Sequence, residues 1–419
     1  MNEAALASAS APTPDTDCLV IGAGPAGLMA AETVARAGYS VLVVDAMPNP
    51  ARKFLMAGRG GLNLTHSEKL FDFISRYGEA RSWLAPILRQ FTPQDLIDWC
   101  HDLGIETFVG SSGRVFPKTF KASPLLRAWL ARLNSQSVRF ALRHRFTGFD
   151  QNKNALFATE QGTVSLSART RILALGGASW PKLGSRADWV PLLAEQGVDI
   201  APFKPSNMAV HVAWSSHITD RFAGTPIKRV SLTHGGQTVR GEAVLTQTGL
   251  EGGAIYALSA SLRTALERDP STTLMLDLRP DMPEKILRER LQSPRGKTSQ
   301  STFLHRAAGL APVGIALMRE ACGGPLPDDP AALLRLIKTL PVTINGVAGL
   351  ERAISSAGGI RRNALDDHLM LKAMAGVFAC GEMLDWEAPT GGYLLQATFA
   401  QGHRAGLGAV KYLQHSQRA

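Results

Sequence analysis

The clearest hydrophobic pattern along the chain lies between residues 17 and 45. The segment DCLVIGAGPAGLMAAETVARAGYSVLVVD contains an apolar run, a glycine-rich turn, an alanine-rich stretch that ends at Gly38, and a second apolar run. Short apolar runs bounded by turn residues predict strands, whereas the alanine-rich stretch predicts a helix. This segment therefore predicts a βαβ unit.

Two later segments resemble parts of the same unit. Around residue 171, RILALGGAS predicts a short strand that ends in paired glycines, and from residue 376 GVFACGEMLDWEAPTGGYLLQATFAQG predicts a strand, an acidic turn, a Gly-Gly pair and a helix. Strands of one parallel sheet would bring these glycine turns together at one edge. We therefore expect an α/β nucleotide-binding domain assembled from both ends of the chain.

The middle of the chain has a different character. Residues 197–345 are richer in Pro and Thr and contain β-like runs such as VSLTHGGQTVRGEAVLT, followed by a charged helical stretch near 281–291. This predicts an inserted β-rich domain with a helical part near 281–340. The expected organisation is a disordered tail over 1–16, a nucleotide domain over 17–196 and 346–419, and the insert between its two parts.

The turn of the βαβ unit has the form G-x-G-x-x-G. Its residues are Gly22, Gly24, Pro25, Ala26 and Gly27, with Ala23 between the first two glycines. In this pattern the glycines allow a tight turn, close approach of a pyrophosphate, and close packing of helix on strand. An acidic residue that ends the second strand accepts hydrogen bonds from a ribose.

Asp45 stands at that position, and an acid there disfavours a 2′-phosphate. The fingerprint thus predicts FAD or NAD rather than NADP.

Composition limits the class of protein but indicates no particular chemistry. The 419 residues are 45% hydrophobic and 19% charged, which is ordinary for a globular protein of two domains. No stretch approaches the roughly 18 uncharged apolar residues that a membrane helix needs, and residues 1–16 lack the basic residues of a secretory signal. The four cysteines form no CxxC pair, so they indicate reduced thiols in a cytoplasmic protein and neither a redox dithiol nor a metal site.

Charge is distributed unevenly. Lys and Arg exceed Asp and Glu by 45 to 35, a net charge of +10, and residues 107–149 contain no acid. The basic residues of this acid-free stretch are Arg114, Lys118, Lys121, Arg127, Arg132, Arg139, Arg143 and Arg145. They form either a solvated basic face or a surface that guides an anion or RNA.

The motifs in their order give the chain a family resemblance. GAGPAG, RKFLMAGRGGLN, GRVFPKTFKAS, LALGGASWPKLGS, GEAVLTQTGLEGGAI, SSAGGI and GEMLDWEAPTGGYLLQATFAQG resemble the BaiN-like, or aminoacetone-oxidase-type, family of FAD-dependent oxidoreductases over nearly the whole chain. The resemblance implies a Rossmann-like FAD domain, similar to that of glutathione reductase, interrupted by a β-barrel and a small helical insertion. Where the family commonly has Gly-Gly-Arg-Cys-Asn, this chain has Arg59-Gly60-Gly61-Leu62-Asn63. If the family's cysteine takes part in the chemistry, this protein works differently or on another substrate.

The glycine-rich, basic loop after Asp45 then has a predicted role. Arg52 and Lys53 are placed to meet the phosphates or the adenine edge, and the glycines let backbone amides approach the isoalloxazine. The residues expected around the cofactor, besides the fingerprint turn, are Asp45, Ala46, Arg52, Lys53, Arg59, Gly61, Asn63, Phe146, Gly176, Gly177, Gly381, Glu382, Gly392, Tyr393 and Leu394.

Some of these residues carry a more specific expectation. The resemblance puts the carboxylate of Glu382 on the ribitol or a nearby hydroxyl, with a surface turn as the alternative. The helix that opens after Gly392 would present its first amides to the flavin pyrimidine, where a helix N-terminus stabilises the anion of reduced flavin. Phe146, on a strand predicted over 138–146, is assigned to the adenine side, and His144 on the same strand is interpreted as a surface or internally bonded histidine.

No catalytic side chain is assigned from the sequence. Flavin carries the redox chemistry itself, so Tyr393, as a proton donor or a packing residue, and Arg114 are only candidates.

Three functions are open at this point. The resemblance implies an enzyme that exchanges hydride between flavin N5 and a small conjugated, enone-like substrate or a small amine or ketone. The family also includes enzymes that reduce uridine to dihydrouridine in ribosomal RNA, and a non-catalytic FAD protein that binds RNA or another partner is the third reading. No second G-x-G-x-x-G marks a separate NAD(P)H domain, so either NAD(P)H binds transiently over the flavin or another electron donor is used.

Overall fold

The structure is a computed structural model that describes residues 15–58 and 60–416. Most of the tail predicted over residues 1–16 therefore lies outside the described residues, as does Arg59. Strand β1 (Thr16–Ile21) begins inside the predicted tail. Thr16 belongs to the sheet because it pairs with Ala168 and its hydroxyl donates to the Ser40 carbonyl at 3.0 Å.

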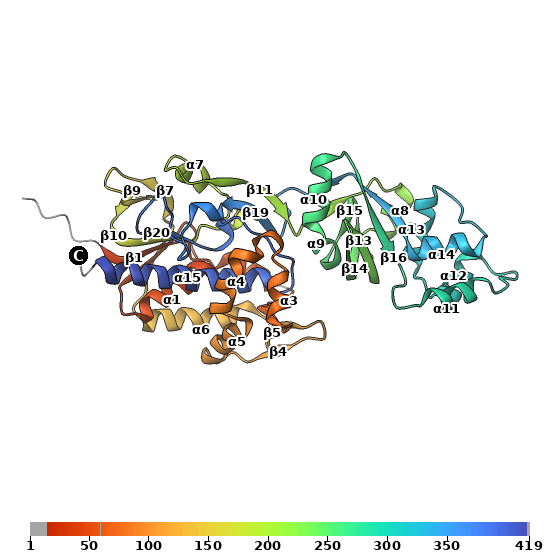
Figure 1. Cartoon of the computed structure of the whole chain (residues 1–419), viewed down its shortest axis with the longest axis horizontal. Helices are drawn as coiled ribbons and strands as arrows, with labels where there is room; N and C mark the ends of the chain where they lie inside the picture. The colour runs from red at the N-terminus through yellow and green to blue at the C-terminus, as the bar shows by residue number, and fades with distance from the viewer. Residues whose placement is uncertain (1–14, 59, 417–419) are drawn as a thin grey trace, which may run out of the picture.

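A parallel five-stranded sheet forms the centre of the larger domain (Figure 1). Its order is β20-β10-β1-β2-β6, with β2 (Val41–Asp45), β6 (Arg139–Leu142), β10 (Ala168–Leu173) and β20 (Val377–Ala379). All four pairings are parallel. The carboxyl ends of β1, β10 and β20 therefore lie side by side, and the glycine turns that follow them share one edge.

The helices of this domain come from both ends of the chain. They are α1 (Pro25–Arg36), α2 (Arg52–Ala57), α3 (Leu70–Ser75), α4 (Arg81–Gln90), α5 (Pro93–Asp102), α6 (Ala122–Ser135), α7 (Trp189–Ala194) and α15 (Tyr393–Ser416). The long C-terminal helix α15 packs directly on α1, the helix of the predicted βαβ unit. At this contact a Cβ on Gly402 would lie 2.3 Å from the Ala26 carbonyl oxygen. The two helices therefore meet backbone to backbone.

The larger domain also contains two small antiparallel sheets. The first has the order β3-β5-β4, with β3 (Thr65–His66), β4 (Thr107–Val109) and β5 (Arg114–Pro117), and the second contains β7 (Arg145–Phe149), β8 (Ala155–Thr159) and β9 (Gly162–Leu166). The single strand predicted over 138–146 is wrong, because the segment is divided between β6 and β7. Arg143 adopts a φ of 61° at the break, and the His144 amide donates to the Asp45 carbonyl at 2.9 Å, so the chain leaves the parallel sheet there.

A second unit is built from the middle of the chain and extends from one end of the first (Figure 1). Its strands are β12 (Val210–His211), β13 (Pro226–His234), β14 (Gln237–Thr246), β15 (Gly249–Glu251), β16 (Thr272–Asp277), β17 (Leu340–Ile344) and β18 (Gly346–Val347). Its helices are α8 (Ser216–Phe222), α9 (Gly253–Tyr256), α10 (Ser259–Arg268), α11 (Glu284–Leu291), α12 (Gln300–Ala308), α13 (Pro312–Cys322) and α14 (Pro330–Lys338).

The strands of this unit form one antiparallel sheet in the order β17-β16-β13-β14-β15-β12-β18. Only Asn345 separates β17 from β18, although these strands stand at opposite ends of the order. The sheet must therefore curl until its two edges approach each other.

The two units have separate hydrophobic cores. Residues 18–198 and 360–409 contribute to the first core, and residues 210–344 contribute to the second. An antiparallel pair, β11 (Ile200–Ser206) and β19 (Ser355–Ile360), joins the units, so the chain leaves and returns along one ribbon. Within the described ranges, no helix combines the length and the hydrophobicity needed to cross a membrane.

The close contact between α1 and α15 allows us to predict how one added methyl group would change the stability of the protein. A Gly→Ala change inside a helix normally stabilises it by about 1 kcal/mol, but at Gly402 the added Cβ would overlap the Ala26 carbonyl. We expect Gly402→Ala to lower the midpoint of thermal unfolding, because overpacking costs roughly 1 to 3 kcal/mol.

Gly314 in α13 provides the matched control, since a Cβ there would meet only Leu278 and Leu310 side chains at 3.7 Å. Gly314→Ala should leave the midpoint unchanged or raise it. A Gly402→Ala protein that unfolds at or above the wild-type temperature would contradict the proposed importance of this contact.

Candidate functional site

The site is a cleft over the carboxyl ends of the parallel strands, and the fingerprint turn forms its floor. Gly22 has a φ of 109°, and a Cβ there would lie 2.2 Å from the Ala174 carbonyl oxygen. Gly27 packs α1 against the turn, since its Cβ would lie 1.9 Å from the Gly22 carbonyl oxygen. Both glycines are therefore required by the protein itself.

Gly24 differs from these two glycines. It is the N-cap residue of α1 with an extended φ of −79°, and among the described residues no atom lies within 4 Å of a Cβ built on it. Neither the backbone nor the packing of the protein requires glycine here. The open space in front of the first amides of α1 fits the pyrophosphate of a dinucleotide, which a side chain would exclude.

Asp45 stands at the end of β2 beside this turn. Its Oδ2 accepts a hydrogen bond from the Ala23 amide at 2.7 Å, and its Oδ1 accepts one from the Met47 amide at 2.8 Å. Burial raises the pKa of Asp45, against the opposing effect of the two amides and of nearby Arg52. A carboxylate can accept about four hydrogen bonds, so Asp45 keeps capacity for ribose hydroxyls while it braces the turn.

The cleft brings together many of the residues selected from the sequence. Those that line it are Gly22, Gly24, Pro25, Asp45, Ala46, Arg52, Lys53, Phe146 and Gly176, together with His144. Sequence reasoning missed Met47, Asn49, Leu183, Gly184 and Ser185, which line it as well. Gly184 and Ser185 belong to the motif LALGGASWPKLGS, and this membership was the sequence signal that could have identified them. In the structure the Ser185 hydroxyl donates to the Gly177 carbonyl at 2.7 Å.

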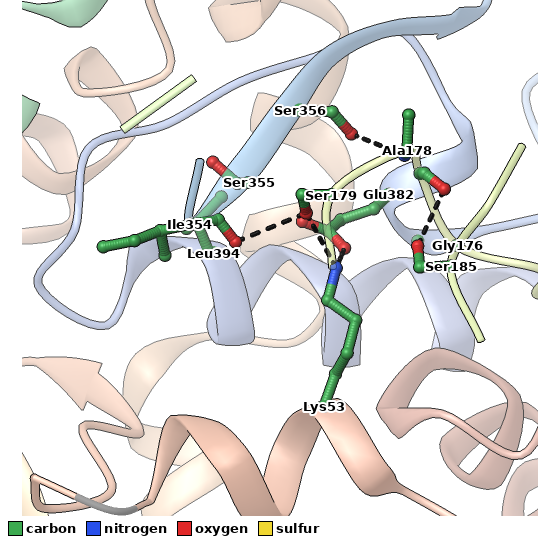
Figure 2. A network of polar contacts seen from close by, with 12 residues as sticks. Lys53, Gly176, Ala178, Ser179, Ser185, Ile354, Ser355, Ser356, Glu382 and Leu394 are labelled. Carbon is green, nitrogen blue, oxygen red and sulfur yellow. Dashed lines mark hydrogen bonds and ion pairs between the residues drawn. The ribbon is translucent and has the colours of Figure 1, made fainter. Parts of the chain in front are cut away.

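An ion pair joins the two ends of the chain at this cleft. Figure 2 shows Lys53 reaching from α2 towards Glu382 and Ser179. The Lys53 Nζ lies 2.6 Å from Glu382 Oε2 and donates to the Ser179 hydroxyl at 3.0 Å. The Lys53 ammonium, predicted to meet phosphates or the adenine edge, thus holds the carboxylate that the resemblance assigns to the ribitol.

Among the described residues that line this cleft none belongs to α15, whose start lies against β3. Gly392 has a φ of 99°, and a Cβ there would lie 2.5 Å from the backbone of Thr65, so the turn before the helix touches β3. In the same region Asn63 Oδ1 is buried and has no hydrogen-bond partner among the described residues. Asn63 stands two residues before Thr65, which the turn touches, so this acceptor and the first amides of α15 suit a polar, planar group such as the pyrimidine ring of a flavin.

Tyr393 and Leu394 form the first turn of α15. The Tyr393 hydroxyl donates to Glu68 Oε1 at 2.6 Å, and Arg76 forms an ion pair with Glu68 at 2.7 Å. Burial raises the pKa of the Tyr393 phenol, and the hydrogen bond to Glu68 raises it further. The structure therefore gives this hydroxyl a bonding role inside the protein.

Leu62, which replaces the family's cysteine, is fully buried. Its amide donates to the Phe120 carbonyl at 2.7 Å, which ties the glycine-rich loop to the chain after β5. Gly61 lies in the same loop, whereas Arg59 lies outside the described residues.

Gly177 and Gly381 follow the ends of β10 and β20, and the Gly381 amide donates to Gln401 of α15 at 2.9 Å.

Arg114 lies at the junction of the two units. A Cβ on Gly391, in the turn before α15, would be 3.9 Å from its Nε, and a Cβ on Gly253, at the start of α9, would be 3.7 Å from its Nη2. Arg114 is half-buried and forms no ion pair with any carboxylate in residues 15–58 or 60–416. Within the part of the chain that the structure describes, Arg114 is thus a cation without a carboxylate partner, close to the turn that precedes α15.

The acid-free stretch is less basic in the folded protein than in the sequence. Four of its eight cations form ion pairs with acids from other segments: Lys118 with Glu106, Arg132 with Glu32, Arg143 with Glu160 and Arg145 with Asp188. The folded surface therefore carries less free positive charge than the linear count indicates.

Comparison with known proteins agrees with this geometry. The profile described as HI0933-like protein Rossmann domain matches residues 16–408. The chain is 25% identical to a 3-dehydro-bile acid delta(4,6)-reductase from Clostridium scindens, covering 94% of this chain and 98% of that protein. It is 24% identical to a ribosomal RNA dihydrouridine synthase from Escherichia coli, covering 91% and 94%.

Among solved structures, a 3-ketosteroid-delta4-(5alpha)-dehydrogenase from Rhodococcus jostii RHA1 is similar in fold. The TM-score is 0.52 at 17% identity, over 96% of this chain and 98% of that one. These matches confirm the family resemblance and the Rossmann-type fold predicted from the sequence.

The open space at Gly24 generates a direct test. Gly24→Val should leave folding intact, because no described atom stands near the new side chain, yet weaken FAD binding by more than about 100-fold, or about 2.7 kcal/mol. The measurement is FAD retention after gel filtration and the dissociation constant from flavin fluorescence. Gly324→Val is the matched control, since a Cβ there also meets nothing within 4 Å. Equal FAD affinity in both variants would remove Gly24 from the site.

The Lys53–Glu382 ion pair joins residues 329 positions apart, and we expect substitutions at these two positions to have coupled effects on FAD binding. Lys53→Met should weaken FAD binding about tenfold or more, because the partly buried Glu382 carboxylate loses its cation. Combining it with Glu382→Gln should recover part of that loss, with a coupling of about 1 to 3 kcal/mol in a double-mutant cycle. Strictly additive effects on the FAD dissociation constant would show that the two side chains act independently.

Proposed function

The chain belongs to the HI0933-like family and is an FAD-dependent oxidoreductase, and we propose that it reduces the conjugated carbon–carbon double bond of a small apolar enone. Bound FAD supplies hydride exchange at its N5. The relative from Clostridium scindens is named for reduction at the delta(4,6) positions of a 3-dehydro-bile acid, which supports this substrate class.

The single observation that carries the proposal is the start of α15 at the Gly391–Gly392 turn. This 24-residue helix begins where its turn touches Thr65 of β3, two residues along the chain from Asn63, whose buried Oδ1 has no partner among the described residues. The first amides of a helix have no partners within it and carry partial positive charge. They would stabilise negative charge on a reduced flavin, which makes the cofactor easier to reduce.

The side chains near that helix start favour hydride exchange over covalent catalysis. The Leu62 side chain carries no nucleophilic group, and the Tyr393 hydroxyl donates its hydrogen bond to Glu68 at 2.6 Å. The protein therefore binds and orients its reactants and supplies charge, which are the tasks that flavin chemistry leaves to a protein.

We infer that NAD(P)H supplies the electrons by binding transiently over the flavin. The chain has one dinucleotide turn, and that turn faces the cleft assigned to FAD. The four free cysteines, three of them buried, support a cytoplasmic location, where thiols stay reduced.

Reduction of uridine in ribosomal RNA is the second candidate. Its support is the name of the relatives from Escherichia coli and Haemophilus influenzae, each 24% identical to this chain. The ion pairs of Lys118, Arg132, Arg143 and Arg145 reduce the free charge available for phosphates and make this the weaker proposal.

The test is anaerobic reoxidation of the protein after reduction with NAD(P)H. We expect cyclic enones of one to four rings to restore the oxidised flavin absorbance, because their double bond accepts the hydride. The corresponding saturated ketones are the control and should leave the flavin reduced. No reoxidation by any enone, together with dihydrouridine formation in unmodified ribosomal RNA, would favour the second candidate.

A further inference from the structure

An aromatic face lies on the small sheet β3-β5-β4. On β5, Arg114 and Phe116 alternate with buried Val115 and therefore point to the same side. Phe108 of β4 stands directly opposite Phe116, and Phe120 follows just after β5. The ring centroids of the three phenylalanines lie 4.9 to 5.8 Å apart, so they form one cluster, which we call the phenylalanine shelf.

The phenylalanine shelf belongs to neither hydrophobic core. None of its three rings is part of the two clusters of buried residues, and Phe120 is 48% exposed. Three neighbouring aromatic rings left partly open to water represent apolar area that a ligand could cover favourably.

The shelf is continuous with the predicted flavin loop. A Cβ on Gly61 would lie 3.2 Å from the Phe120 ring and 3.6 Å from the Phe116 ring. Glycine at this position thus lets the loop lie flat against the aromatic rings. The rings extend the surface that the loop would present to the isoalloxazine.

Arg114 supplies the polar end of the same face. Its guanidinium lies close to Gly391 before α15 and to Gly253 of the insert, and no carboxylate of the described residues pairs with it. A guanidinium left without a counter-ion beside apolar rings is suited to an oxygen that carries or develops negative charge.

We propose that the phenylalanine shelf binds the flat, apolar rings of the substrate and that Arg114 donates hydrogen bonds to its carbonyl oxygen. This assignment rests on the proposed function, which it extends by a substrate-binding surface and one catalytic residue. When hydride adds to the β-carbon of the enone, the double-bond electrons move towards the carbonyl and an enolate oxygen forms. Arg114 stabilises that oxygen, a solvent proton then adds to the α-carbon, and the product is the saturated ketone.

2-Naphthol is a suitable probe, because it has two flat apolar rings and its oxygen ionises to an analogue of the enolate. Its binding to the oxidised, FAD-loaded protein can be followed by absorbance across a pH series, without turnover. We expect the pKa of naphthol to be at least one unit lower when bound to the wild-type protein than in water, because Arg114 favours the anion.

Four variants separate the two parts of the shelf. Arg114→Gln should abolish the shift and weaken naphtholate binding about 10- to 100-fold, while Arg114→Lys should keep much of both. Phe116→Ala should weaken both forms of naphthol by about tenfold and leave the pKa of the bound form unchanged. Arg127→Gln removes the same charge from an exposed site on α6 and should change neither quantity.

Several results would overturn the assignment. An unchanged shift in Arg114→Gln, or an equal loss in Arg127→Gln, would show that Arg114 does not contact the oxygen. Displacement of naphthol by poly(U) in the wild-type protein, lost in Phe116→Ala, would instead assign the shelf to RNA bases.

Failure of the proposed function has a different signature. If the naphthol shift depends on Arg114 while no enone reoxidises the wild-type protein, the binding surface stands and the enone activity fails. If enones are reduced equally by wild-type protein and Arg114→Gln, the activity stands and the role of Arg114 fails.

Discussion

The backbone contact between α1 and α15 is the constraint on which the site depends. A Cβ on Gly402 would lie 2.3 Å from the Ala26 carbonyl oxygen, and one on Gly406 would lie 2.7 Å from the Thr33 side chain. Only helices without side chains at these points can approach so closely. This approach places the start of α15 against β3 and brings Glu382 within 2.6 Å of Lys53, so residues more than 300 positions apart form an ion pair beside the cleft.

The insert is bonded to the segment that directly precedes α15. Asn207, buried and left-handed with a φ of 51°, donates to Ser355 at 2.7 Å and to the Ala388 carbonyl at 2.8 Å, and it accepts from the Thr390 amide at 3.0 Å. Beside it, Arg263 of α10 pairs with Glu387 at 2.6 Å. The ribbon that carries the insert is therefore bonded to residues 387–390, directly before the glycines that open α15. A change in the position of the insert would be transmitted to the start of α15.

Local pattern was sufficient for the parts of the fold that depend on neighbours in sequence. The βαβ unit, its glycine turn and Asp45 follow from hydrophobic runs and spacing, because each role is set by backbone geometry within about 30 residues. Contacts between distant segments could not be read in that way. The pairing of Lys53 with Glu382, the acids that neutralise the 107–149 stretch, and the break at Arg143 all depend on segments that meet only in the folded chain.

The replacement of the family's cysteine by Leu62 illustrates the difference between sequence and structure. From the sequence, loss of a thiol beside the flavin loop suggests altered chemistry. In the folded protein the Leu62 side chain is fully buried, and only its amide is engaged, in a bond to the Phe120 carbonyl that holds the loop against the phenylalanine shelf. At this position a larger apolar side chain contributes packing free energy. Leu62 therefore acts on the position of the shelf relative to the glycine-rich loop, and in the proposed mechanism the α15 amides and Arg114 supply the electrostatic stabilisation.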